Sequence, residues 1–472
     1  MPRPISLLAL TLALAAPLPA QDGSPTAVLD RGIARMGGDS LLRTVHALRL
    51  DVLTQWLRTE FGEAPFQDAP SLERNVELRD YASGAWRNSR YFSLDATAPG
   101  LVVVVDDTIA TMGRVMQRDD PTLTWGPLNI AYVDERRELF AFAPERLLLT
   151  LRDDPTRRAL PDTILDGVRH VRLAAVVDGW PSVTFLSRQT GLPTLVRFRA
   201  DEVNDFGLAP WGEHEVEFWY TGWRPVAPGV LLPRQRDVRR VGRPYKRMTV
   251  LSAAVNPPLG ADSFAVADSV RAAYLATARA PMWDVPLEGG ARLVDHDFAV
   301  MPGFTGSAGA VRVGGEWVVF ETGQAAGAMA AVAAWLGQQD AATPIGAGFA
   351  TSVRTGNGGA PWFGTAHRPV YAGPAAARLL DHVPGAAAAV TPIREARWLR
   401  IGSDSVWVEP VSGPDLDGAL AVYVPTLEWL WSPFSASPFH GPEQQALVAR
   451  LAERGFAVRR TGGPGALLTP AR

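Results

Sequence analysis

Short segments that alternate apolar and polar residues occupy much of the first 256 positions of this chain. Segments 48–54, 75–81 and 215–220 alternate clearly, segment 195–199 follows a turn, and 101–107 is apolar and enters an Asp-rich turn. A period of two is typical of strands with one buried face. Repeated hairpins of this kind predict a large antiparallel sheet.

Two helical segments interrupt these strands. The first covers residues 27–36 and is stopped by Gly37 and Gly38, and the second covers 144–151 with Pro144 in its first turn. Proline is favoured there because the first amide groups of a helix have no partner within the helix. The first part of the chain is therefore predicted to be an α+β unit, a strongly curved antiparallel sheet with helices on one face.

The pattern changes after residue 255. Segment 255–260 contains Asn, Pro and Gly and breaks the last strand, and a short helical stretch follows at 268–279 before Pro281 and Pro286. Because such residues punctuate domains, we place the boundary near residue 280. The chain then divides into a leader at 1–20, a β-rich unit at 21–280 and a second unit at 281–472.

The second unit alternates strands with helices. Two strands, 310–313 and 317–321, flank a Gly-Gly turn. The remaining expected elements are helices at 324–336, 375–382 and 442–454 and strands at 418–424 and 456–459. Hairpins followed by alternating elements predict a layered α/β sandwich.

The composition and the N-terminus indicate an exported protein. The chain has 472 residues, so two or three domains are expected, and a formal net charge of -3 gives no indication of a nucleic-acid partner. Residues 1–20 have a basic start at Arg3, an apolar stretch and a small-residue cleavage site, as in a secretory signal peptide. We therefore expect a periplasmic or secreted protein whose mature chain has no transmembrane segment. The sequence has no Cys, which excludes disulfides.

Several segments, taken in order, resemble a known family. Residues 306–311 with 318–321 resemble the first hairpin of the metallo-β-lactamase fold, and 413–425 resembles a later segment of it. Residues 348–359 end in the Gly-Gly pair of that family's metal-binding loop, Thr-His-x-His-x-Asp-His-x-Gly-Gly. Residues 32–41 resemble the helix that begins the N-terminal half-barrel, of the lipoprotein-carrier type, in exported two-domain members. The resemblance implies such a half-barrel followed by an αββα sandwich.

The metal ligands of that family are missing from the corresponding positions. The three His positions fall on Thr351, Val353 and Gly356, the Asp position falls on Thr355, and the next His position falls at or beside Asp415. Valine and glycine offer no donor atom, and zinc requires about four N, S or O ligands. The resemblance therefore implies a degenerate site and no cofactor. It favours a non-catalytic binding or scaffold protein whose partner is an apolar small molecule, a lipid or an envelope protein.

Two alternatives remain open. In the first, the chain is a metal-dependent hydrolase with a displaced zinc site formed by His296, Asp415 and His440, although the 295–297 segment also fits a polar turn before a strand. In the second, the β-rich unit alone carries a lipid or lipoprotein.

An arginine-rich segment lies towards the end of the β-rich unit. Its basic residues surround the turn at 242–244 and are Arg234, Arg236, Arg239, Arg240, Arg243, Lys246 and Arg247. One interpretation is a solvated hairpin edge that charge protects from aggregation. The other is a contact with an anion or a lipid headgroup.

Aromatic residues gather near the end of the second unit. Trp429, Trp431, Phe434 and Phe439 lie where the rim of the family's active site is expected. They predict either an apolar binding cleft or ordinary core packing.

Overall fold

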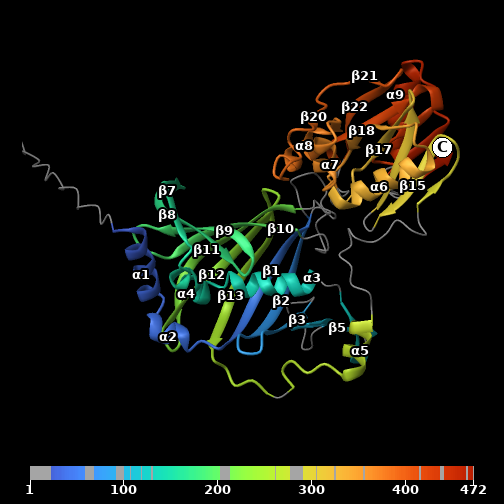
Figure 1. Ribbon diagram of the computed structural model, residues 1–472. Coiled ribbons are helices and arrows are strands. Elements are labelled where there is room, and N and C mark those ends of the chain that lie inside the picture. The colour runs from blue at the N-terminus through green and yellow to red at the C-terminus, as the bar shows by residue number, and fades with distance from the viewer. Residues whose placement is uncertain are drawn as a thin grey trace, which may run out of the picture.

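The computed structural model describes most of the chain (Figure 1). The described residues are 23–58, 69–91, 100–106, 108–117, 120–128, 131–201, 213–260, 262–276, 291–303, 306–323, 326–353, 357–413, 416–435, 441–463 and 466–470. The predicted leader at 1–20 and the predicted boundary near residue 280 lie outside them.

One antiparallel sheet organises the first part of the chain. Its strands run in the spatial order β6-β5-β4-β3-β2-β1-β13-β12-β11-β10-β9-β8-β7, and Figure 1 shows the sheet curving around helices. The strands are β1 (Ala47–Arg58), β2 (Ala69–Asp80), β3 (Ala85–Tyr91), β4 (Leu101–Val105), β5 (Ala110–Gln117), β6 (Asp120–Pro127), β7 (Arg158–Leu165), β8 (Val168–Val177), β9 (Trp180–Ser187), β10 (Pro193–Asp201), β11 (Glu213–Val226), β12 (Val230–Arg240) and β13 (Arg243–Val255). The strands predicted from alternation are confirmed.

Five described helices accompany this sheet. They are α1 (Pro25–Arg35), α2 (Asp39–Arg43), α3 (Ala131–Ala141), α4 (Pro144–Asp153) and α5 (Asp268–Ala276). The two helices expected early in the chain are confirmed as α1 and α4. Helices α2 and α3 were not predicted, because α2 is very short and α3 (AYVDERRELFA) mixes charged and apolar residues without a clear apolar stripe.

The apolar half of the core lies between the sheet and helices α1 and α4. The Phe142 ring stacks on Phe198 with the ring centroids 4.3 Å apart and meets Phe218 edge-on at 5.8 Å. The buried Tyr220 hydroxyl donates a 2.6 Å hydrogen bond to the Phe142 carbonyl. This contact fixes the turn between α3 and α4 against β11.

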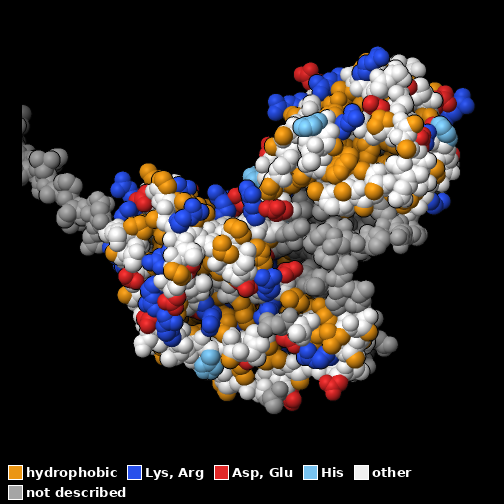
Figure 2. Space-filling view, viewed as in Figure 1, with side chains coloured by type: hydrophobic (Ala, Val, Ile, Leu, Met, Phe, Trp, Pro, Cys, Tyr) orange, Lys and Arg blue, Asp and Glu red, His pale blue; other side chains and the backbone are white. Residues whose placement is uncertain are grey.

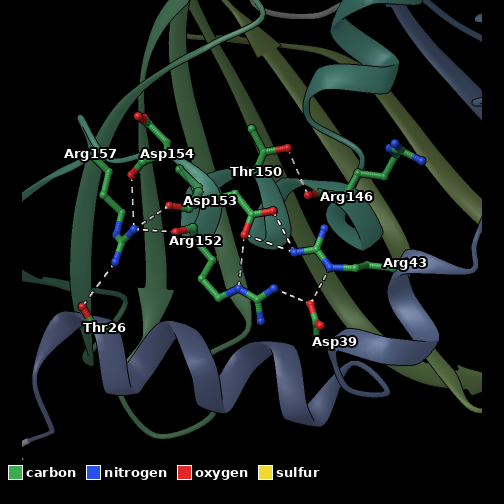
Figure 3. A network of polar contacts seen from close by, with 10 residues as sticks. Thr26, Asp39, Arg43, Arg146, Thr150, Arg152, Asp153, Asp154 and Arg157 are labelled. Carbon is green, nitrogen blue, oxygen red and sulfur yellow. Dashed lines mark hydrogen bonds and ion pairs between the residues drawn. The ribbon is translucent and has the colours of Figure 1, made fainter.

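Surface ion pairs join α2 to α4 (Figure 3). Arg43 contacts Asp39 at 2.9 Å and Asp153 at 2.8 Å, and Arg152 also pairs with Asp39. Acidic and basic side chains are interspersed on this face of the molecule (Figure 2). Because exposed pairs of this kind contribute little to stability, they orient the helices rather than hold the fold together.

The second unit is built from two sheets. The first has the order β14-β15-β16-β17-β18-β19-β20 and the second has the order β21-β22-β23-β24-β25-β26. Their strands are β14 (Arg292–Leu293), β15 (Phe298–Gly303), β16 (Gly306–Val313), β17 (Glu316–Phe320), β18 (Ile345–Ala350), β19 (Val370–Ala372), β20 (Val390–Pro392), β21 (Arg397–Ile401), β22 (Asp404–Gly413), β23 (Leu416–Val424), β24 (Trp429–Trp431), β25 (Arg460–Gly463) and β26 (Ala466–Pro470).

The two sheets pack face to face, with helices outside. Phe298, Phe320 and Phe349 from the first sheet share one core with Val422 and Trp429 from the second. Buried residues of α6 (Ala326–Gln339), α7 (Ala360–Thr365) and α8 (Pro374–Leu380) pack with the outer face of the first sheet, and those of α9 (Gly441–Glu453) pack with the outer face of the second. The layered α/β sandwich predicted from the sequence is confirmed.

One predicted strand of this unit is wrong. Residues 456–459 contain no regular element, and β25 begins at Arg460. Phe456 instead stacks on Tyr423 with the ring centroids 5.0 Å apart, so its apolar side chain serves a helix-to-strand connection.

Among the described residues, no helix is long and apolar enough to cross a bilayer.

Replacing glycine by alanine is expected to have opposite effects on stability at Gly32 and at Gly337, because only Gly32 lies against another backbone segment. An added Cβ on Gly32 in α1 would lie 2.2 Å from the Gly191 carbonyl oxygen, whereas one on the exposed Gly337 in α6 would meet nothing within 4 Å. Gly32→Ala should lower the free energy of unfolding by about 1–3 kcal/mol because α1 must shift. Gly337→Ala should raise it by up to about 1 kcal/mol. Denaturant titration of both variants checks this, and a neutral Gly32→Ala would contradict it.

Candidate functional site

Segment 348–359, predicted from the sequence to be a degenerate metal-binding loop, begins within β18. Strands β17 and β18 are parallel neighbours, so their carboxyl ends meet at one edge of the sheet. Glu321 follows β17 directly with a φ of 58°, and Thr351 follows β18 directly. In open α/β sheets this edge is the usual place for a ligand site.

A closed hydrogen-bond network fills this edge. The Thr351 hydroxyl donates to Glu321 Oε1, and the Asn357 side-chain amide donates to Glu321 Oε2 at 3.0 Å. Trp431 Nε1 donates to Thr351 Oγ1 at 3.0 Å, and the backbone amide of Thr322 donates to Asn357 Oδ1 at 3.0 Å. These five side chains are all buried. The carboxylate of Glu321 is therefore satisfied by this chain's own donors.

The residues in this place do not fit zinc. Thr351 is 0% exposed, and its hydroxyl is already engaged by Glu321 and by the Trp431 indole. Val353 is buried and has no donor atom. In the described part of the chain, no group of three or more His, Cys, Asp or Glu residues could hold a metal ion. Thr355, Gly356 and Asp415 lie outside the described residues.

Glu321 and Asn357 were not identified from the sequence as site residues. An acidic residue at the end of the apolar segment 317–320 is a signal for Glu321, because a carboxylate directly after a buried strand requires donors. For Asn357 the sequence offers no such signal, since Asn is common in Gly-rich loops.

The aromatic residues near the expected rim form core rather than a cleft. Trp429 and Trp431 are fully buried, and the Trp431 ring stacks on Phe320 with the centroids 4.8 Å apart. Phe434 is also buried and packs near α9. Of the two interpretations, core packing holds for these three residues, and Phe439 lies outside the described residues.

His296 lies in the polar turn that precedes β15. Its side chain is 78% exposed, and Nδ1 is 2.8 Å from Asp297 Oδ1. The turn interpretation of segment 295–297 agrees with this geometry. His440 and Asp415, the other members of the displaced site, lie outside the described residues, so that site stays a prediction.

The arginine-rich segment forms the hairpin of β12 and β13, which lies inside the large sheet between β11 and β1. Arg236, Arg240, Arg243 and Lys246 are buried there. The expectation of a solvated hairpin edge is therefore wrong for these four residues, because alternate side chains point to the concave face, which α3 and α4 cover.

Carboxylates from α3 reach these cations. Glu138 lies 3.3 Å from Arg240, and Glu135 lies 2.8 Å from Lys246. Burial alone would raise the pKa of Glu135, but the charge and hydrogen bond of Lys246 outweigh it, so the pKa is lowered. These two ion pairs thus hold helix α3 against the sheet.

Strands β2 and β3 extend the buried charged region. Glu77 pairs with Arg79 at 2.7 Å, and Glu73 pairs with Arg90 at 2.6 Å. At the start of α4, Glu145 accepts a hydrogen bond from the Tyr81 hydroxyl. Burial and the charge of Glu145 raise the pKa of Tyr81 well above its ordinary value, so the hydroxyl stays a donor.

Comparisons with known proteins give likeness to solved structures only. No protein-family model matches the chain, and no curated protein matches it. A metallo-β-lactamase from Pontibacter korlensis is similar at 14% identity and a TM-score of 0.31, over 38% of this chain and 93% of that one. The DIM-1 metallo-β-lactamase gives 14% identity and 0.32, over 38% and 90%.

A third similar solved structure covers a larger share of this chain. A putative outer membrane lipoprotein-sorting protein domain from Vibrio parahaemolyticus is 10% identical with a TM-score of 0.30, over 51% of this chain and 95% of that one. Likeness at this level says nothing about activity, so the site is interpreted from its own residues.

Removing one hydroxyl tests the network. Thr351→Val removes the acceptor of the Trp431 indole and leaves Glu321 Oε1 with the longer 3.3 Å hydrogen bond from the Thr351 backbone amide, so it should lower the free energy of unfolding by about 1–3 kcal/mol. Thr351→Ser keeps the hydroxyl and should cost about 1 kcal/mol or less. Because valine is the more apolar side chain, burial alone would favour Val over Ser. Denaturant titration that finds the Val variant more stable than the Ser variant would therefore refute the network's role.

Acid should weaken the attachment of α3 through Glu135. The folded-state pKa of Glu135 lies below its unfolded value of 4.5, so its contribution is fully present above pH 4.5 and is lost as the pH falls through the folded value. Glu135→Gln should therefore destabilise the protein at neutral pH, and this difference from wild type should shrink below pH 4.5. The measurement is the free energy of unfolding across that range. The exposed Glu213→Gln is the matched control and should show little difference at any pH.

Proposed function

We propose that this chain is an exported, non-catalytic member of the metallo-β-lactamase superfamily that acts as a binding or scaffold protein. The observation that carries the proposal is the position of the Thr351 hydroxyl between Glu321 and Trp431. A catalytic loop of that family would hold an imidazole at this position, facing a metal ion.

Physical chemistry supports a structural role for the loop. A metal-dependent hydrolase keeps an open coordination position for water, from which it makes a hydroxide at neutral pH. Here the side chains at the strand ends satisfy one another and are buried. The Trp431 indole stacks on Phe320 and belongs to the core between the two sheets, so reopening the site would disrupt that core.

Export and binding complete the proposal. The basic, apolar and small-residue segments of 1–20 have the order of a secretory leader. With no metal chemistry supported by the described residues, the remaining roles for such a two-unit protein are recognition of an apolar molecule, a lipid or an envelope protein.

Metal content and hydrolysis together test this proposal. The purified mature chain is dialysed with zinc and then against buffer, and bound metal is measured by elemental analysis. Hydrolysis of a chromogenic β-lactam and a chromogenic ester is followed on the same sample. We expect less than stoichiometric metal and hydrolysis at the background rate.

One outcome would replace the proposal with the displaced-site hydrolase. That outcome is one or two zinc ions retained per chain, together with hydrolysis that His440→Ala or His296→Ala abolishes. Retained metal that neither substitution removes would also refute the degenerate site, because it would require ligands elsewhere.

A further inference from the structure

The large sheet is split between β12 and β13. These strands pair from Arg240↔Arg243 to Gln235↔Thr249, and there the pairing stops. Residues 230–233 of β12 continue on β11 alone, and residues 250–255 of β13 continue on β1 alone. The backbone amide of Leu231 donates instead to the Met36 carbonyl after α1, at 3.0 Å. We call this opening the β12–β13 seam.

Two local features explain the seam. Continuing the register of Gln235↔Thr249 would place Pro233 opposite Leu251, and proline has no amide hydrogen to donate. On the other side, β13 has a bulge against β1, because Asp51 pairs with Ser252 and Val52 pairs with Val250, so Leu251 is skipped. A bulge bends its strand and increases local twist. Both features move the strands apart at the same point.

A groove opens to solvent at the seam. Its volume is about 350 Å³, and its lining includes Pro225, Val226, Leu232, Leu251 and Ala253. Leu251 is 49% exposed at this groove. Two exposed arginines, Arg224 and Arg234, stand at the same groove. The mouth is therefore apolar with positive charge beside it.

A smaller cavity lies behind the groove, on the concave side. Its volume is about 40 Å³, more than the about 10–15 Å³ that one water molecule needs. Leu232, Pro233 and Val250 line both the groove and the cavity. The cavity is mostly apolar, with Arg79, Arg236 and Glu145 as its charged lining residues. The groove and the cavity are thus neighbours at the seam.

Arg236 is the cation in this cavity that the described residues do not neutralise. It is 6% exposed, and its Nη2 atom lies 3.5 Å from Met248 Sδ, while its guanidinium lies over the Phe218 ring at 4.8 Å. Its Nε atom is buried without a hydrogen-bond partner. Arg79 differs, because Glu77 pairs with it at 2.7 Å. A buried cation without an ion-pair partner destabilises the fold, and an anion bound in the cavity would offset that destabilisation.

We infer that the β12–β13 seam admits a single-chain aliphatic carboxylate, whose head group pairs with Arg236 and whose tail lies along the apolar groove. A carboxylate presents two coplanar oxygens that match the planar guanidinium. Beside Glu145, which lines the same cavity, a monoanion adds one negative charge and a phosphate dianion adds two, so the monoanion is favoured. Burial, followed by the nearby charge of Arg79, lowers the pKa of Arg236, but an arginine remains charged at neutral pH.

Calorimetric titration of the mature chain with three probes tests this inference. Decanoate carries both head and tail, 1-decanol carries the tail without the charge, and acetate carries the charge without the tail. We expect decanoate to bind with one site per chain, and decanol and acetate to bind at least tenfold more weakly. A charge-assisted hydrogen-bonded pair corresponds to a roughly 10- to 100-fold effect on affinity.

Two variants assign the head group. Arg236→Met should weaken decanoate binding at least tenfold, and it should raise the thermal midpoint of the ligand-free protein, because it removes an unneutralised buried charge. Arg239→Met is the matched control: Arg239 lies on the same strand, is exposed, and stacks over Trp219 at 5.3 Å, so it should leave binding unchanged.

Three results would overturn the inference. The first is equal affinity for decanol and decanoate, which would indicate an apolar groove only. The second is equal affinity for acetate and decanoate, which would indicate a head-group site without a tail. The third is unchanged affinity for decanoate in Arg236→Met. Absence of decanoate binding to the wild-type chain would overturn it as well. The inference concerns the first sheet alone, so its failure leaves the proposal for the second unit untouched.

Discussion

The pairing of buried charges beneath α3 and α4 is the constraint on which the first unit depends. Glu138 of α3 meets Arg240 of the sheet with both side chains buried, and the half-buried Glu135 meets Lys246. Removing one partner of such a pair costs about 3–5 kcal/mol because the other charge stays buried alone. The helix and the β12–β13 hairpin therefore stabilise each other.

The two units differ in whether a buried charged group has hydrogen-bond partners. At the strand ends of the second unit, Glu321 has donors from Thr351 and Asn357, and the region is closed. In the first unit, Arg236 lines a cavity, and its buried Nε atom has no hydrogen-bond partner among the described residues. A satisfied buried group stabilises a fold, whereas an unsatisfied one is a place where a ligand gains affinity. A bound ligand is therefore expected in the large antiparallel sheet rather than at the strand ends of the second unit.

Sequence patterns predicted local elements well. The period of two identified strands such as β1 and β11, and Pro144 marked the start of α4. The patterns failed where tertiary contacts override them. Residues 456–459 look like a strand, but Phe456 is held by Tyr423 in a connection. The arginine-rich hairpin looked like a solvated edge, because a charged residue in a sequence does not reveal which neighbour neutralises it.

The sequence by itself determined that β-rich and mixed α/β regions follow one another, and that segment 348–359 contains no His. Both conclusions depend on residue types and on spacing along the chain, which sequence contains directly. Only the tertiary structure decided that Trp431 and Asn357 close the site around Glu321, and that Pro233 and the bulge at Leu251 open the sheet beside Arg236. These outcomes depend on which distant segments meet, and local spacing does not fix that.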